Sequence, residues 1–111
     1  MPFVDPSSLE PHEPRPGWSG RFFHSDHMTF AYYVIAAGAD VHPHEHPNEE
    51  VWHVVEGALE LTVGAQAGVV RAGEAAIVPA QERHSVRAIE PTRAIVVDHP
   101  RRESVAGIPL H

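Results

Sequence analysis

Histidines are concentrated in one short stretch of this 111-residue chain. Four of the ten fall between positions 42 and 53, and His44 and His46 are separated by a single residue. Residues i and i+2 of a strand point to the same face, so both imidazoles can bind one metal ion. The turn-forming residues 47–49 would bring Glu50 back toward the same point. Two imidazoles and one carboxylate leave coordination positions open, which is typical of a reactive metal centre.

Two further histidines are candidates for this site. His84, far along the chain, can supply a third imidazole. His42 has the strand parity of His44 and is either a general base that lines the pocket or a residue of its rim. Such ligands accept Fe, Mn, Ni, Cu, Co or Zn, so we expect one divalent transition metal ion of unspecified identity.

Strand parity also sorts the residues that follow Glu50. Trp52 shares the parity of Glu50 and is expected to line the cavity, as a substrate-facing wall or as ordinary core, whereas His53 is expected to face away. We expect the remaining histidines at the surface: His12, His24, His27, His99 and His111.

Runs of β-branched and aromatic residues between Gly and Pro breakers predict a series of short strands. The expected ranges are 21–24, 29–37, 51–56, 58–63, 69–71, 75–78, 85–89 and 93–98. Segment 21–24 is a candidate edge strand, and segment 29–37 is apolar on both faces, which predicts a strand between two layers. No segment has a sustained helical period, so we predict an all-β barrel or sandwich.

Length and composition limit the alternatives. The chain is long enough for one domain, and we divide it into a proline-rich N-terminal arm at 1–17 and a barrel at 18–111. With 8 basic and 15 acidic residues the net charge is −7, so we expect no nucleic-acid or membrane partner. Cysteine is absent, and the first residues lack the features of a signal peptide, so we expect a cytoplasmic protein.

The spacing of the candidate ligands resembles that of the cupin superfamily. Its first motif, G-x5-H-x-H-x3-E-x6-G, is matched at all five fixed positions by Gly38, His44, His46, Glu50 and Gly57. Its second motif, G-x5-P-x-G-x2-H-x3-N, is matched by Gly73, Pro79 and His84, with Gln81 and Ala88 at the two departures. The resemblance implies a single-domain antiparallel β-barrel of the jelly-roll type, a metal held by His44, His46, Glu50 and His84, and a homodimer.

The C-terminal segment 97–101 is loosely similar to the Pro-Pro-Arg segment of many small cupins, including the pectin-degradation type that ketonises unsaturated uronates. In that type an acidic residue on the final strand assists proton transfer, and the comparable place here is expected to hold Ile95. This expectation counts against a direct transfer of the activity. Arg101 is either a carboxylate-binding residue or a solvated surface arginine.

Two functions of different classes follow. The first is a metal-dependent enzyme acting on a small oxygen-bearing substrate, such as a sugar acid or carboxylate, by isomerisation, elimination or dioxygen chemistry, with Glu50 and His42 as catalytic residues. The second is a binding module that holds a metal or small ligand without turnover. A barrel without metal that serves only dimerisation is a weaker third hypothesis. The fold does not decide among the three, because one fold hosts many functions.

Overall fold

The computed structural model of the chain describes residues 2–105 and 108–109. The elements are η1 (Pro6–Ser8), β1 (His12–Arg15), β2 (Trp18–His24), β3 (Thr29–Ile35), β4 (Asp40–His44), β5 (Glu49–Glu56), β6 (Ala58–Val63), β7 (Gln66–Arg71), β8 (Ala75–Val78), β9 (His84–Ala88), β10 (Thr92–His99), β11 (Ser104–Val105) and β12 (Ile108–Pro109). None of the described helices has the length and apolar character needed to span a membrane.

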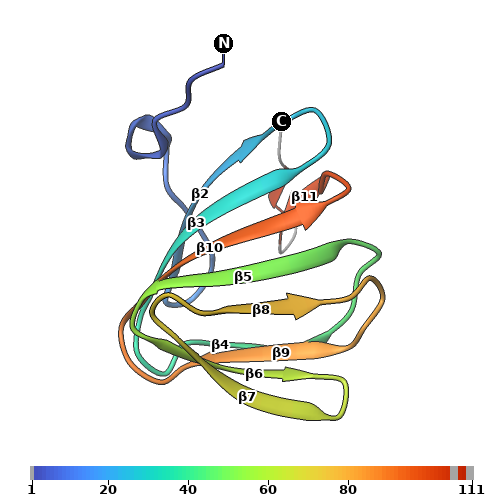
Figure 1. Cartoon of the computed structure of the whole chain (residues 1–111). Coiled ribbons are helices and arrows are strands. Elements are labelled where there is room, and N and C mark those ends of the chain that lie inside the picture. The colour runs from blue at the N-terminus through green and yellow to red at the C-terminus, as the bar shows by residue number, and fades with distance from the viewer. Residues whose placement is uncertain (1, 106–107, 110–111) are drawn as a thin grey trace.

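Two antiparallel sheets make up the body of the molecule (Figure 1). One has the strand order β1-β2-β3-β10-β5-β8, and the other has the order β4-β9-β6-β7. The strands of both sheets alternate between inward and outward side chains, and the inward ones form one apolar core between the sheets. Its largest fully buried apolar side chains are Trp18, Ile35, Leu59, Val54 and Val78. The prediction of an all-β, antiparallel barrel of the jelly-roll type is confirmed.

The eight expected strands are present as β2, β3 and β5 to β10, and the structure adds β1, β4, β11 and β12. Segment 21–24 is the second half of β2, which pairs with β3 on one side and with β1 on the other. β1 pairs only with the first half of β2, at Trp18 and Gly20, so segment 21–24 has a ladder partner on one side only, as expected of an edge strand, while β1 itself is the edge strand of the sheet. Residues 12–15 therefore belong to the larger sheet.

The outward face of the larger sheet carries many apolar side chains, and Arg21, His53 and Arg93 also lie on it. Phe30, Tyr32 and Val34 of β3 and Ile95 of β10 lie on it, and the exposed fraction of Val34 is 52%. Pro6 and Ser7 of η1 line a pocket on this face together with Tyr32 and Ile95. The described chain itself leaves part of the outward side of β3 uncovered, so a second layer there stays a prediction. Two apolar faces on one strand do not by themselves show which layers cover it.

The smaller sheet has a polar outward face, which provides an internal contrast. Its outward positions include Asp40 of β4, Arg87 of β9 and Glu60 of β6, all exposed. Arg87 pairs across the ladder with both acidic residues, so opposite charges lie side by side. This is the usual pattern of a sheet with one solvated side. The apolar outside is thus a property of the larger sheet alone.

The glycines of the two motifs make turns that other residues resist. Gly57 joins β5 to β6 with a φ of +92°, and a Cβ added there would lie 2.5 Å from Thr92 Oγ1 and against the carbonyl oxygen of Pro91. Gly38, with a φ of +81°, precedes β4. Such conformations carry a steric penalty for residues with a Cβ. The glycines therefore set the turns that flank the histidine-rich segment.

Candidate metal centre

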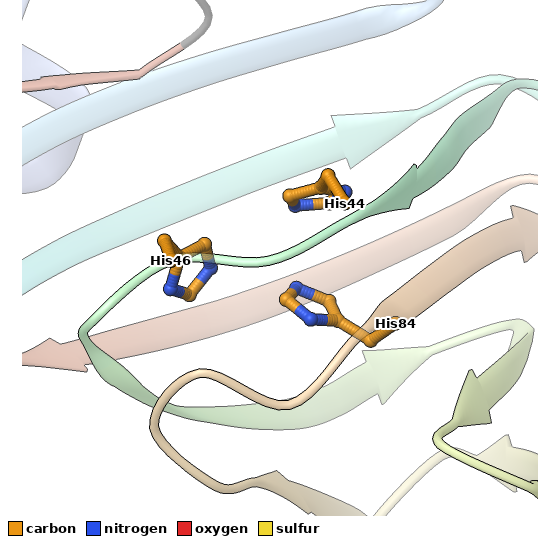
Figure 2. Close-up of side chains that lie close together, drawn as sticks. All are labelled: His44, His46 and His84. Carbon is orange, nitrogen blue, oxygen red and sulfur yellow. The ribbon is translucent and has the colours of Figure 1, made fainter.

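Three imidazoles from two distant segments of the chain meet between the two sheets (Figure 2). His44 ends β4, His46 lies in the loop that follows, and His84 begins β9. The ladder pairs His44 with His84 directly, which brings their ring centroids to 4.2 Å. One nitrogen of each ring lies within 4.8 Å of the others. Nitrogen atoms bound to one ion at about 2.0–2.1 Å are separated by about 3–4 Å, so the spacing is close to that of a metal centre.

Backbone carbonyl groups orient all three rings. Nδ1 of His44 lies 2.9 Å from the carbonyl oxygen of His42, Nδ1 of His46 lies 3.1 Å from that of Asn48, and Nδ1 of His84 lies 2.8 Å from that of Glu82. A carbonyl oxygen only accepts hydrogen bonds, so each Nδ1 carries the proton and donates it. Each Nε2 therefore keeps a free lone pair, which is the state that a metal ion binds.

The environment of these nitrogens fits a metal ion. Nε2 of His46 and Nε2 of His84 are buried and have no hydrogen-bond partner among the described residues. Buried polar atoms are normally paired, so two unpaired nitrogens in one place indicate a missing partner. Burial also lowers the pKa of His44, which favours the neutral imidazole that a metal requires. The donor set suits a divalent transition metal ion.

The loops that carry these histidines are held by specific contacts. The backbone N–H of Gln81 donates to the carbonyl oxygen of His46 at 2.8 Å. The side-chain amide of Asn48 donates to the backbone carbonyl oxygen of Pro100. Gln81 has a φ of +64°, the only positive φ of a non-glycine residue in the described chain. This explains why the second motif often has glycine there. Gln81, in place of glycine, adopts the same left-handed turn conformation at some steric cost.

Glu50 and Asp98 form a buried carboxylate pair beside the histidines. Oxygens of Glu50 lie 3.3 Å from Nε2 of His46 and 3.5 Å from Nε2 of His84. Burial opposes the charged form of Glu50. Without a metal, protons on Nε2 of His46 and His84 would be hydrogen-bonded to Glu50, and together with Asp98 they hold its pKa well below the ordinary value. Burial and the negative charge of Glu50 raise the pKa of Asp98 to about 9. The two neighbouring carboxyl groups thus differ in pKa, and Asp98 is the one whose surroundings favour the protonated form.

A cavity of about 60 Å³ opens beside this pair. Trp52 lines it and donates its indole N–H to Glu50 at 2.5 Å, as the parity of its strand predicted. Arg102, half-buried after β10, lies 3.8 Å from Glu50 and 4.0 Å from Asp98. Arg15 and Trp18 also line the cavity. The site thus combines nitrogen donors, two carboxyl groups and cationic side chains.

The structure leaves His42 outside the cluster. Its side chain is exposed, its ring centroid lies 6.2 Å from that of His44, and its backbone carbonyl is the part that contacts the site. His53 is exposed and faces away, as expected. Of the histidines expected at the surface, His24 is half-buried against Thr29 and His111 lies outside the described residues, while the others are exposed: His12, His27 and His99.

The acidic residue of the last strand lies at a different position from the one expected. Ile95 is on the outward face, while Asp98 points inward and is 3% exposed. The signal was present, since Ala94, Val96 and Asp98 share one parity in β10 and the first two are core residues. Arg101 is exposed, and Arg102, which carried no signal in the sequence, contacts the carboxylates instead.

Comparison with known proteins agrees with this geometry. The family model for the cupin domain matches residues 31–99, which include the strands that carry His44, Glu50 and His84. The uncharacterized protein SCO3923 of Streptomyces coelicolor is 32% identical over 81 residues, which cover 72% of this chain and 77% of that protein.

Two solved structures share the fold. KdgF from Halomonas sp. has a TM-score of 0.86 at 24% identity, covering 93% of this chain and 96% of that one. A variant of oxalate decarboxylase from Bacillus subtilis has a TM-score of 0.79 at 17% identity, covering 87% of this chain and 29% of that one. With the family match over most of the barrel and the histidine cluster in place, the chain belongs to the cupin domain family.

Proposed function

We propose that this cupin is a metal-dependent enzyme that transfers a proton on a small carboxylate or sugar-acid substrate, as an isomerase or lyase. The observation that carries the proposal is the buried pair of carboxyl groups, Asp98 and Glu50, directly beside three imidazoles whose Nε2 atoms are free to bind a metal. A carboxylic acid and a carboxylate in different environments are the usual donor and acceptor of such reactions.

Each residue then has a role that its environment supports. His44, His46 and His84 hold the ion, and Glu50 is close enough to two of them to be a fourth ligand or a base. When bound, the ion supplies a Lewis acid for a substrate oxygen. Glu50 accepts a proton from a substrate carbon, and Asp98 returns one to another substrate atom. Protons balance, and no electron leaves the substrate.

The size of the site and one neighbour support a small substrate. The cavity of about 60 Å³ is well below the roughly 300–1,000 Å³ of sites for drug-sized ligands. Oxalate decarboxylase, which shares the fold, is named for a small carboxylate. Carbonyl and hydroxy acids of a few carbons are therefore the first candidates.

Deuterium exchange tests this function through the substrate alone, whatever the product is. Protein loaded separately with Mn, Fe, Co, Ni or Zn is incubated in D2O with a panel of small hydroxy, keto and unsaturated sugar acids. We expect at least one acid to acquire deuterium at a carbon faster than with metal-free protein, measured by NMR. A protein that binds metal tightly but exchanges none of these acids contradicts the proposal and favours the binding module.

We also propose that a second copy of the chain covers the apolar face of the larger sheet. Five strands about 4.8 Å apart, each about six residues long with a rise of 3.3 Å per residue, cover roughly 500 Å² of sheet surface. Two copies packed through this face would therefore bury roughly 1,000 Å² in total. This reaches the lower limit of a specific interface. The face includes Ile77 at 64% exposure and Val34 at 52%. Exposed apolar surfaces of this size mark protein contacts.

Substitution at the centre of this face tests the homodimer. Ile95→Arg places a charge in the middle of the apolar surface, and we expect a shift from twice the 12.2 kDa chain mass to the single chain mass. Sedimentation velocity measures the change. Thr62→Arg, on the outward side of the smaller sheet, is the matched control and should stay dimeric. A wild-type monomer, or a dimer that survives Ile95→Arg, refutes this assignment.

A further inference from the structure

Two arginines line the cavity beside the histidines, and their surroundings differ. Arg102 has its charge compensated by the carboxylate of Glu50, which lies 3.8 Å away, and it also lies 4.0 Å from Asp98. Arg15 is half-buried at the end of β1, and no described residue forms an ion pair or hydrogen bond with its side chain. A guanidinium offers five N–H donors and no acceptor. An unpaired cation at the wall of a small cavity is therefore an anchor for an anion.

A second unpaired donor lies at the same wall. Trp18 is 2% exposed, and its indole N–H is buried without a hydrogen-bond partner among the described residues. The other tryptophan of the chain, Trp52, lines the same cavity and does have a partner, the carboxylate of Glu50. Buried donors are normally paired. The ring of Trp18 is packed edge-on to Tyr33 and Trp52, so an acceptor on a bound molecule reaches its indole N–H only after the ring shifts.

The hairpin between β1 and β2 brings these two donors together. Arg15 and Trp18 are partners in the ladder, joined by a turn in which Gly17 has a φ of +82°. The backbone N–H of Gly17 donates to the side chain of Glu13 at 3.1 Å, which further defines the turn. The proline-rich N-terminal segment thus contributes a side chain to the cavity of the barrel.

We propose that Arg15 is a specificity-determining residue that binds the carboxylate of the substrate, with the indole N–H of Trp18 as the second donor. This inference rests on the proposed function and adds its substrate class, namely small acids that carry a carboxylate in addition to the oxygen that faces the metal. An arginine pairs with a carboxylate through two parallel hydrogen bonds, which selects the anion over a neutral amide of the same shape. Arg102, already paired, is less available for this role.

Matched ligands that differ only in charge test the inference. Binding of 3-hydroxypropionate and of its neutral amide is measured by calorimetry on metal-loaded and on metal-free protein. Charge-assisted hydrogen bonds predict that the wild-type protein binds the acid about 10- to 100-fold more tightly than the amide. Arg15→Gln should remove most of this preference at unchanged metal content, and Arg15→Lys should restore part of it. Arg93→Gln, which removes an exposed arginine on the outward face of β10, is the control and should keep the preference.

The outcomes separate this inference from the function on which it rests. A wild-type protein that binds metal but does not bind the acid, or that binds acid and amide equally, overturns the role of Arg15 alone. An acid preference that persists in Arg15→Gln overturns it as well. If the wild-type protein binds no metal, the metal-dependent function is contradicted. The preference of the metal-free protein for the acid over the amide still decides the role of Arg15.

Discussion

Replacing His84 by glutamine is expected to abolish stoichiometric metal binding. Its Nε2 is one of the two buried imidazole nitrogens without a hydrogen-bond partner among the described residues, and its ring contacts that of His44 at a centroid distance of 4.2 Å. Loss of an outer partner of a metal ligand already weakens binding about 10- to 100-fold, so loss of the ligand itself should exceed this. Elemental analysis of the purified variant measures the metal content.

Thermal unfolding gives a second measurement of the same effect. Metal at about 1,000 times its dissociation constant adds about 4 kcal/mol to the free energy of unfolding, which raises the melting temperature of a domain of this size by at least about 15 °C. The wild-type protein should show this shift on metal addition, and His84→Gln should not. Circular dichroism establishes that the variant is folded.

His42→Ala is the matched control for this experiment. Its side chain is exposed, and the site uses only its backbone carbonyl, which the substitution retains. The metal content and the melting shift should therefore equal those of the wild-type protein. If His42→Ala loses the metal, or if His84→Gln keeps it, the ion is not held by the three histidines that the structure brings together.

Asp98→Asn is expected to lower turnover by about 10²- to 10⁴-fold without loss of the metal. Removal of a positioned general acid typically costs a factor of this size. Asparagine keeps the shape of the side chain and still donates a hydrogen bond toward Glu50, so the barrel should remain folded. Initial rates and the rate of deuterium uptake into the substrate are measured on metal-loaded protein.

A purely structural role for Asp98 makes a different prediction. It would change the melting temperature and leave deuterium uptake per bound metal unchanged, which would contradict the proton-transfer role. Asp40→Asn, at an exposed position of β4, is the matched control and should retain the full rate. Glu50→Ala should alter the metal content, the rate or both. A Glu50→Ala protein unchanged in both would exclude Glu50 from the reaction.

The local pattern of residue types was sufficient to predict the strands and three of the candidate ligands. Strand parity depends only on neighbouring residues, so the inward direction of Trp52 could be inferred directly. His46 joins His44 at the site although it lies in the loop after β4, where strand parity does not apply. The glycines at 38 and 57 likewise indicated turns, because only glycine adopts a positive φ without steric cost. His84 was identified because its spacing from Gly73 and Pro79 matched a motif.

Contacts between distant segments could not be inferred in this way. Three features depend on how the sheets fold over each other. They are the cover on the outward face of β3, the strand at the sheet edge beside β2, and the arginine that contacts the carboxyl groups. Asp98 had the right parity, but its raised pKa results from burial beside Glu50, a partner 48 positions away. The sequence by itself determined the strands and the types of candidate ligand, because these follow from local geometry. The tertiary structure alone decided that Asp98 and Glu50 form a buried pair and that Arg15 has no ion-pair partner among the described residues. Desolvation and pairing depend on neighbours that only the folded chain supplies.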